Sequence, residues 1–281
     1  MTGMTGWEPH ADAWFLVVVL LGGYLYALSA WGPEHAPGRP AATRRQRWCY
    51  YAGVATIWLA ADWPVKVLAD SLFSAHMAQH MVFSLVSAPL LLLGTPGWLL
   101  RKLLSPRPVN ALARVVTRPM IAFLIFNTWI VLYHWPVVVN LSVSNDGFHL
   151  LAHIGWMVSS LIMWWPVLSP LPELPHMSSP GRMVYLFGQS IVPTVPASFL
   201  TFGDGLLYHA YAHAPTMFGV NPIDDQQIAG LLMKIAGGFL IWGVITVIFF
   251  RWSVDSESGA PDRLYWRDLE PELDRLAASN H

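Results

Sequence analysis

Histidines dominate the residues of this chain that could carry chemistry. The sequence has eleven of them. Six form three pairs with a spacing of four residues: His76/His80, His149/His153 and His209/His213. Residues four apart share one face of a helix, so each pair can direct two imidazoles toward one point. Neutral imidazole is the commonest protein ligand for metal ions. Together with His134, the pattern predicts a metal site built from histidines.

Each pair taken alone says little about a metal, because a single histidine in a membrane helix is more often a hydrogen-bonding residue between helices. Seven histidines at one depth instead favour a shared metal site over seven separate structural roles. Such sites have about four ligands. Some of the seven are therefore expected to orient the ligands through hydrogen bonds or to form a second site.

The other sulfur and nitrogen donors narrow the choice of metal only partly. Imidazole suits copper, zinc and iron, and thioethers would favour Cu(I). The single cysteine, Cys49, rules out an intramolecular disulfide and a cysteine-pair metal site. Met77, Met81 and Met217 lie near the histidines in the sequence. Met77 and Met81 each follow a histidine by one residue and so point about 100° away from the imidazole face. We therefore interpret these two as packing residues.

The elements that must position these histidines are membrane helices. Only 12% of the residues are charged and 54% are hydrophobic, whereas charged residues make up about a quarter of an ordinary soluble domain. A helix that crosses ~30 Å of hydrocarbon needs roughly 20 mainly apolar residues. Seven stretches qualify, of which the second is short: 12–31, 48–63, 72–100, 119–139, 148–168, 183–203 and 226–250. The sequence predicts an all-α, seven-helix membrane bundle.

Basic residues predict the orientation of this bundle, because they collect in cytoplasmic loops. Fourteen of the sixteen lysines and arginines lie in alternate connections, at residues 39–47, 101–118 and 182 and from 251 onward; the exceptions are Lys66 and Lys234. The amino terminus is therefore expected outside and the carboxyl terminus in the cytoplasm, with all seven histidines toward the outer side. We expect a membrane domain over residues 1–251 and a cytoplasmic amphipathic tail over residues 252–281.

Several short motifs, in this order, resemble the multi-helix CtaG family of bacterial cytochrome c oxidase assembly factors. They are HMAQHMVFSLVSAPLLLLGTP in the third stretch, HW after the fourth, HLLAH at the start of the fifth, and then YHAYAH and DDQQIAGLLM. The resemblance covers about residues 10–250 and, besides the histidines, carries over to Asp224, Gln226 and Gly230. Lys234 departs from the family pattern, and we expect it to pair with Asp204, Asp224 or Asp225 or to extend toward the membrane surface.

The resemblance implies a multi-pass protein of the bacterial inner membrane that helps to mature a haem-copper oxidase. Copper is the implied metal. Oxidase subunits, copper donor proteins and the lipid bilayer are the implied partners, and nucleic acid is not. The implied metal residues are His76, His80, His134, His149, His153, His209 and His213. We expect no enzyme, because no nucleophile, base and orienting acid occur at a recognisable spacing.

Two other functional classes stay open. Histidines on facing helices can hold haem iron from both sides, which would make the chain a redox protein with a strong Soret band. Polar residues could also line a path for metal ions or protons through the bilayer. The inner halves of the predicted helices carry almost no ionisable residues, which argues against the path.

Overall fold

The computed structural model describes residues 10–62, 64–212 and 219–258, and every regular element in these ranges is a helix. This confirms the all-α class. The first half contains α1 (Ala11–Tyr26), the π-helical segment η1 (Ala27–Trp31), α2 (Gly32–His35), α3 (Arg44–Ala61), α4 (Val65–Ser71), α5 (Phe73–Met81), the π-helical segment η2 (Val82–Ser87), α6 (Ala88–Gly94), α7 (Gly97–Leu103) and α8 (Arg107–Val116).

The second half follows the same pattern of long helices joined by short turns. It contains α9 (Pro119–Tyr133), α10 (Pro136–Ser144), α11 (Asp146–Leu168), α12 (Ser179–Ile191), α13 (Thr194–Phe202), the 3₁₀ turn η3 (His209–Tyr211), α14 (Pro222–Leu231), the π-helical segment η5 (Leu232–Ala236) and α15 (Gly237–Ser258). The last helix continues through the expected domain boundary at residue 251. The amphipathic part of the expected tail lies outside the described residues.

Five helices are long and apolar enough to cross a membrane, and the number rises to as many as seven if two bent pairs each count as one span. The bent pairs are α3 with α4, which turn by 45°, and α8 with α9, which turn by 83°. The multi-pass character of the chain is thereby confirmed. The count of seven spans and their orientation stay predictions.

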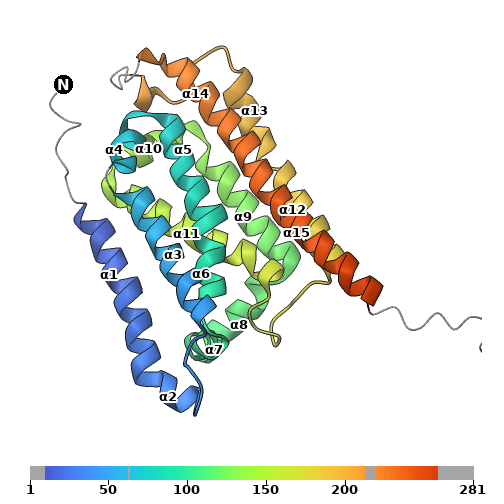
Figure 1. Cartoon of the computed structure of the whole chain (residues 1–281). Helices are drawn as coiled ribbons and strands as arrows, with labels where there is room; N and C mark the ends of the chain where they lie inside the picture. The colour runs from blue at the N-terminus through green and yellow to red at the C-terminus, as the bar shows by residue number, and fades with distance from the viewer. Residues whose placement is uncertain (1–9, 63, 213–218, 259–281) are drawn as a thin grey trace, which may run out of the picture.

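The spans form a bundle with the continuous helix of α5, η2 and α6 near its centre. This helix contacts α3, α11 and α14, while α9 packs on α11. At one edge α1 packs on α3; at the other, α12 and α13 run along α15 and α14 (Figure 1). The starts of α5 and α14 lie at the same end as α4 and α10, and α7 and α8 lie at the opposite end (Figure 1). We call these the histidine end and the arginine end.

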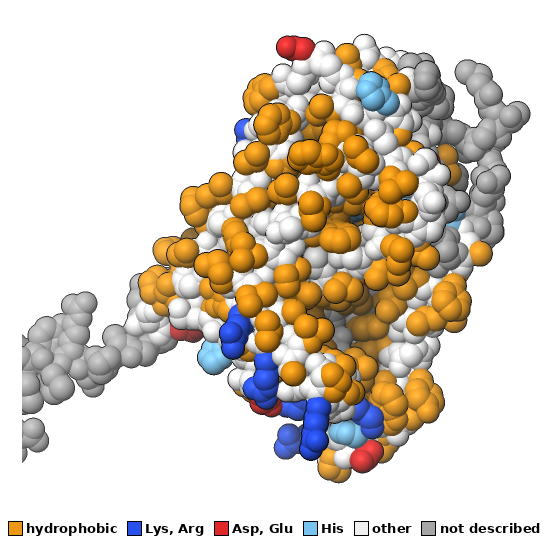
Figure 2. All heavy atoms as spheres, turned by 180° about the vertical axis from the view of Figure 1, so that it is seen from behind, with side chains coloured by type: hydrophobic (Ala, Val, Ile, Leu, Met, Phe, Trp, Pro, Cys, Tyr) orange, Lys and Arg blue, Asp and Glu red, His pale blue; other side chains and the backbone are white. Residues whose placement is uncertain are grey.

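The surface agrees with a lipid environment. Large apolar side chains are exposed along the spans, among them Phe202, Val184 and Phe239. Figure 2 shows apolar side chains over most of one face, with lysine and arginine gathered near one end. Such exposure would be unfavourable in water but is favourable against hydrocarbon, because apolar surface is then removed from the solvent.

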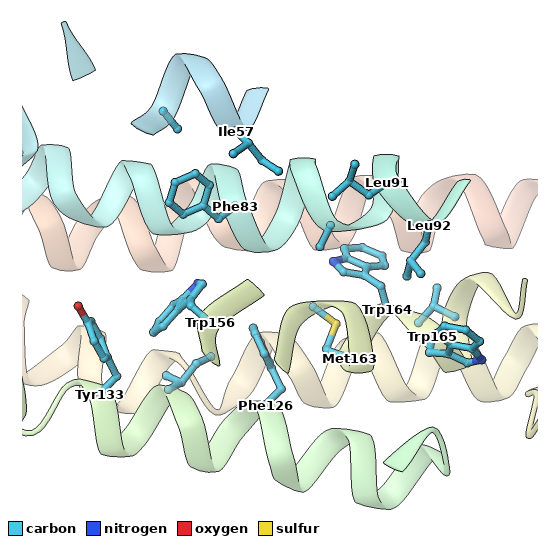
Figure 3. Close-up of a cluster of buried hydrophobic side chains, with 14 of the residues drawn as sticks. Ile57, Phe83, Leu91, Leu92, Phe126, Tyr133, Trp156, Met163, Trp164 and Trp165 are labelled. Atoms are coloured by element: carbon cyan, nitrogen blue, oxygen red, sulfur yellow. The ribbon is translucent and has the colours of Figure 1, made fainter. Parts of the chain in front are cut away.

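Hydrogen bonds from two tryptophans fasten α11 to the central span. In the π-helical segment η2, the regular α-helical pattern of backbone hydrogen bonds is interrupted. The indole N–H of Trp156 donates to the His80 carbonyl oxygen at 3.2 Å, and that of Trp164 donates to the Ser84 carbonyl oxygen at 2.7 Å. Both indoles are buried in the core between the central span and α9 (Figure 3). The helix that carries the second histidine pair is thereby held at a set distance from the helix that carries the first.

Candidate metal centre

Two of the three predicted histidine pairs meet at the histidine end of the bundle. One pair lies on α5 and the other at the start of α11. We call these side chains the four-histidine cluster: His76, His80, His149 and His153. Across the two helices, the ring centres of His80 and His153 are 5.1 Å apart and those of His76 and His149 are 5.9 Å apart.

Within each pair the imidazoles are in contact, as the four-residue spacing predicts. The ring centres are 4.4 Å apart for His76 and His80 and 4.2 Å apart for His149 and His153. Two imidazoles on one tetrahedral ion, with metal–nitrogen bonds of about 2 Å, would have ring centres roughly 5 Å apart. The spacing of the four rings is therefore of the size that a shared ion requires.

The nitrogen atoms do not yet converge on one point. The Nε2 atoms of His76 and His80 are 2.8 Å apart and share a hydrogen bond. Among the described residues, no three His, Cys, Asp or Glu side chains are arranged to hold a metal ion. The rings would have to rotate about their own bonds for their nitrogens to face a common ion.

Two buried imidazole nitrogens of the cluster have no hydrogen-bond partner in the described chain. His76 and His80 are buried and His149 and His153 are half-buried. The Nδ1 atom of His80 and the Nε2 atom of His153 have no hydrogen-bond partner in the part of the chain that the structure describes. A buried polar atom without a partner costs free energy, so these atoms are suited to accept a ligand.

Aromatic side chains enclose the cluster. The ring centre of Trp156 lies 4.4 Å from that of His80. The Tyr133 hydroxyl lies 3.4 Å from His76 Nε2 and 3.1 Å from Ser142 Oγ. The ring of Tyr211 lies 6.3 Å from His76. These rings shield His76 and His80 from water, which strengthens electrostatic interactions around those two side chains.

The remaining predicted histidines do not join the cluster. His134 is buried at the end of α9, where its Nδ1 atom lies 2.7 Å from the Ile130 carbonyl oxygen and its ring contacts those of Tyr133 and Trp156. His209 is exposed and makes no ring contact with the four. His213 lies outside the described residues. The structure therefore brings together four of the six described candidates.

Tyr208 and Tyr211 of the YHAYAH motif face the interior, whereas His209 is exposed. Tyr208 and Tyr211 are three residues apart in a 3₁₀ turn, so they share a face. Both pack on Phe73, and the Tyr208 hydroxyl donates to the His134 carbonyl oxygen at 3.0 Å. Burial raises the pKa of both phenols, which therefore stay protonated. In the sequence, the three-residue spacing of Tyr208 and Tyr211 is the pattern that indicates their shared face. The four-residue spacing of His209 and His213 pointed to the histidines instead.

Two residues of the DDQQIAGLLM motif support the cluster without being part of it. The buried carboxylate of Asp225 accepts hydrogen bonds from Phe73 N at 2.6 Å and from the hydroxyl of Ser74, so it caps the start of α5. Gln226 Oε1 accepts a hydrogen bond from Leu207 N at 2.8 Å and holds the loop that leads to η3. Asp224, to which the resemblance pointed, is exposed.

Gly230 of the same motif permits close helix packing. A Cβ atom at this position would lie 2.5 Å from Thr201 Oγ1 and 2.8 Å from the Ala197 carbonyl oxygen. Only glycine therefore lets α14 approach α13 this closely, which fixes the position of Asp225 one and a half turns earlier.

Lys234 lies outside the cluster, on the π-helical segment η5. Its side chain is exposed along a groove of about 830 Å³ between η5, α12, α13 and α15. No described acidic side chain forms an ion pair with it. The expected ion pair between Lys234 and an aspartate is not formed among the described residues. Asp225 instead accepts hydrogen bonds from the start of α5.

Comparisons with known proteins agree with the sequence motifs. The family model described as cytochrome c oxidase caa3 assembly factor matches residues 22–255. The chain is also similar to the uncharacterized protein Mb0105 of Mycobacterium bovis and the uncharacterized protein MT0111 of Mycobacterium tuberculosis, each 25% identical with 82% of this chain aligned. The chain spans 37% of the length of these curated relatives. No solved structure gives a match.

Proposed function

The chain belongs to the family of cytochrome c oxidase caa3 assembly factors, and on this premise we propose that it handles copper for a haem-copper oxidase. Copper is its cargo, held at the four-histidine cluster and passed on to the catalytic subunit of the oxidase. The protein acts in the bacterial inner membrane with oxidase subunits and copper donor proteins as partners. The role needs no catalytic step.

The observation that carries this proposal is the meeting of four imidazoles from two helices at one end of the bundle. Ring nitrogens of His80 and His153 lack partners in the described chain. Neutral imidazole is a borderline ligand that binds copper well. Exchangeable binding also suits a cluster whose nitrogens reach an ion only after ring rotation, since a carrier must release what it binds.

The exposure of the cluster suggests the path of the ion. His149 and His153 are half-buried, whereas His76 and His80 are buried. Copper reaches the α11 pair first and the α5 pair second. With the histidine end on the outer side, as the distribution of basic residues predicts, the donor delivers copper from that side of the membrane.

Haem is a poorer fit to the same histidines. A macrocycle needs a pocket of several hundred cubic ångströms, while the cavity that touches His80 has a volume of about 50 Å³. Two axial histidines would also have to move apart to admit the ring. We therefore favour copper over haem.

The experiment is to measure the copper and haem content of the full chain after purification under reducing, copper-replete conditions. We expect near-stoichiometric copper without a Soret band, and loss of that copper in the double variant His76→Ala/His80→Ala. Oxidase activity in cells should fall while the variant remains in the membrane. His176→Ala is the matched control, because His176 is exposed in the connection between α11 and α12. Normal oxidase activity and copper content in the double variant would refute the proposal.

A further inference from the structure

A small interior cavity adjoins the four-histidine cluster. It has a volume of about 50 Å³ and lies where the central span meets α9, α11, the α12–α13 connection and η5. Its wall includes His80, Trp156 and Gln189 together with three methionines, Met77, Met81 and Met233. This volume is sufficient to hold a water molecule or a metal ion.

The three methionines converge from separate parts of the chain. Met77 and Met81 lie four residues apart on α5 and share a face, and Met233 comes from η5, more than 150 positions later in the sequence. Met77 and Met233 are buried. Gly237 lies next to Met81, because a Cβ at position 237 would be in ordinary van der Waals contact with Met81 Cε at 3.6 Å.

The helices around the cavity are irregular at the level of the cavity. The π-helical segment η2 begins directly after Met81, and η5 contains Met233. The third wall is the break between α12 and α13, where Pro193 lines the cavity. π-helical turns occur frequently at functional sites. Two π-helical segments and one proline break therefore surround the cavity.

His80 connects this cavity to the four-histidine cluster. Its side chain is fully buried, with Nε2 toward His76 and Nδ1 without a partner in the described chain. The same ring lines the cavity. The His80 imidazole therefore lies between the four-histidine cluster and the thioethers that line the cavity.

We propose that this cavity is a second copper station, in which the thioethers of Met77, Met81 and Met233 bind Cu(I) together with His80. The inference rests on the proposed function and deepens it, because it specifies the oxidation state of the cargo. Thioether sulfur is a soft ligand that selects Cu(I) over Cu(II) and Zn²⁺. The ion arrives and leaves as Cu(I), so no electron transfer is involved.

The competing explanation is that the methionines only fill space, as flexible side chains often do in cores. The sequence alone favours this explanation for Met77 and Met81. The two explanations differ in one measurable property, since only a ligand contributes sulfur to the coordination shell of the metal.

The test is X-ray absorption spectroscopy of the full chain loaded with Cu(I). We expect sulfur as well as nitrogen scatterers in the first shell of the wild-type protein. The triple variant Met77→Leu/Met81→Leu/Met233→Leu should lose the sulfur contribution and bind Cu(I) at least tenfold more weakly. Leucine has a volume similar to that of methionine, so this substitution is usually tolerated in a protein core. Met163→Leu is the matched control, because Met163 is fully buried but does not line the cavity.

The outcomes separate this inference from the proposed function. A wild-type shell of nitrogen alone would overturn the thioether station and leave the histidine cluster standing. Absence of bound copper in the wild type would overturn both. If the triple variant does not fold, the wild-type spectrum still decides the question, because sulfur is then either present or absent in the shell.

Discussion

At the scale of single residues, the cluster separates histidines that meet other histidines from histidines that meet backbone or solvent. His153 lies on the side of α11 that faces α5, and its ring contacts both His149 and His80. His209 is exposed on η3, because the tyrosines beside it occupy the interior. Residue type alone therefore does not decide which histidine is suited to bind an ion.

We predict that His153→Ala lowers the affinity for Cu(I) at least tenfold, whereas His209→Ala changes it less than twofold. The first variant removes one of the four clustered imidazoles that we propose as ligands, and loss even of a residue that only supports a ligand typically costs a factor of 10 to 100. The second removes an exposed ring. Titration against a chromophoric Cu(I) chelator measures both affinities. Equal losses in the two variants would contradict the assignment of copper binding to the four-histidine cluster.

At the scale of helices, the start of α5 depends on a carboxylate from α14. Phe73 N and Ser74 N are unpaired donors at the first turn of a helix, and Asp225 accepts hydrogen bonds from both. A negative charge at a helix amino terminus is also favourable with respect to the helix dipole. The cap fixes where α5 begins and therefore where its two histidines lie.

We predict that Asp225→Ala destabilises the folded protein by about 1–2 kcal/mol, because a lost cap and buried donors without partners each cost this order of free energy. Asp224→Ala is the control, since Asp224 is exposed and should shift stability by less than about 0.5 kcal/mol. Thermal unfolding in detergent, followed by circular dichroism, measures the difference. Two variants of the same stability would mean that the cap is dispensable.

At the scale of the whole molecule, the two ends of the bundle differ in charge and in chemistry. The arginine end carries the basic residues of α7 and α8, including Arg101, Arg107 and Arg114. The histidine end carries the cluster and, among the described residues, a single lysine, Lys66, which pairs with Asp70. Because basic loops stay in the cytoplasm, this asymmetry predicts that the histidine end faces the outer side.

We predict that the histidine end faces outward, and single cysteines introduced into a Cys49→Ser background test this orientation directly. A membrane-impermeant maleimide added to intact cells should label His209→Cys and should label Arg107→Cys only after the membrane is permeabilised. Both positions are exposed. Arg107 begins α8 at the arginine end, and His209 lies in η3, which packs on α10 at the histidine end (Figure 1). The reverse labelling pattern would place the four-histidine cluster on the cytoplasmic side.

Local chemistry made much of this protein predictable from its sequence. Long apolar runs specify membrane helices because a helix satisfies its own backbone in lipid, and the four-residue spacing puts His76 beside His80 and His149 beside His153. The motifs also predicted the family, which the match over residues 22–255 confirms. Each of these properties depends on residues near one another in the chain.

Only the tertiary structure decided which of the pairs meet. The contact between α5 and α11 depends on the indole hydrogen bonds of Trp156 and Trp164 across more than 70 positions, and the start of α5 depends on Asp225, 152 positions from Phe73. That Met233 and Met77 line the same cavity likewise follows from packing between spans. Such contacts arise from shape and hydrogen bonding between helices, and no periodicity within a single helix encodes them.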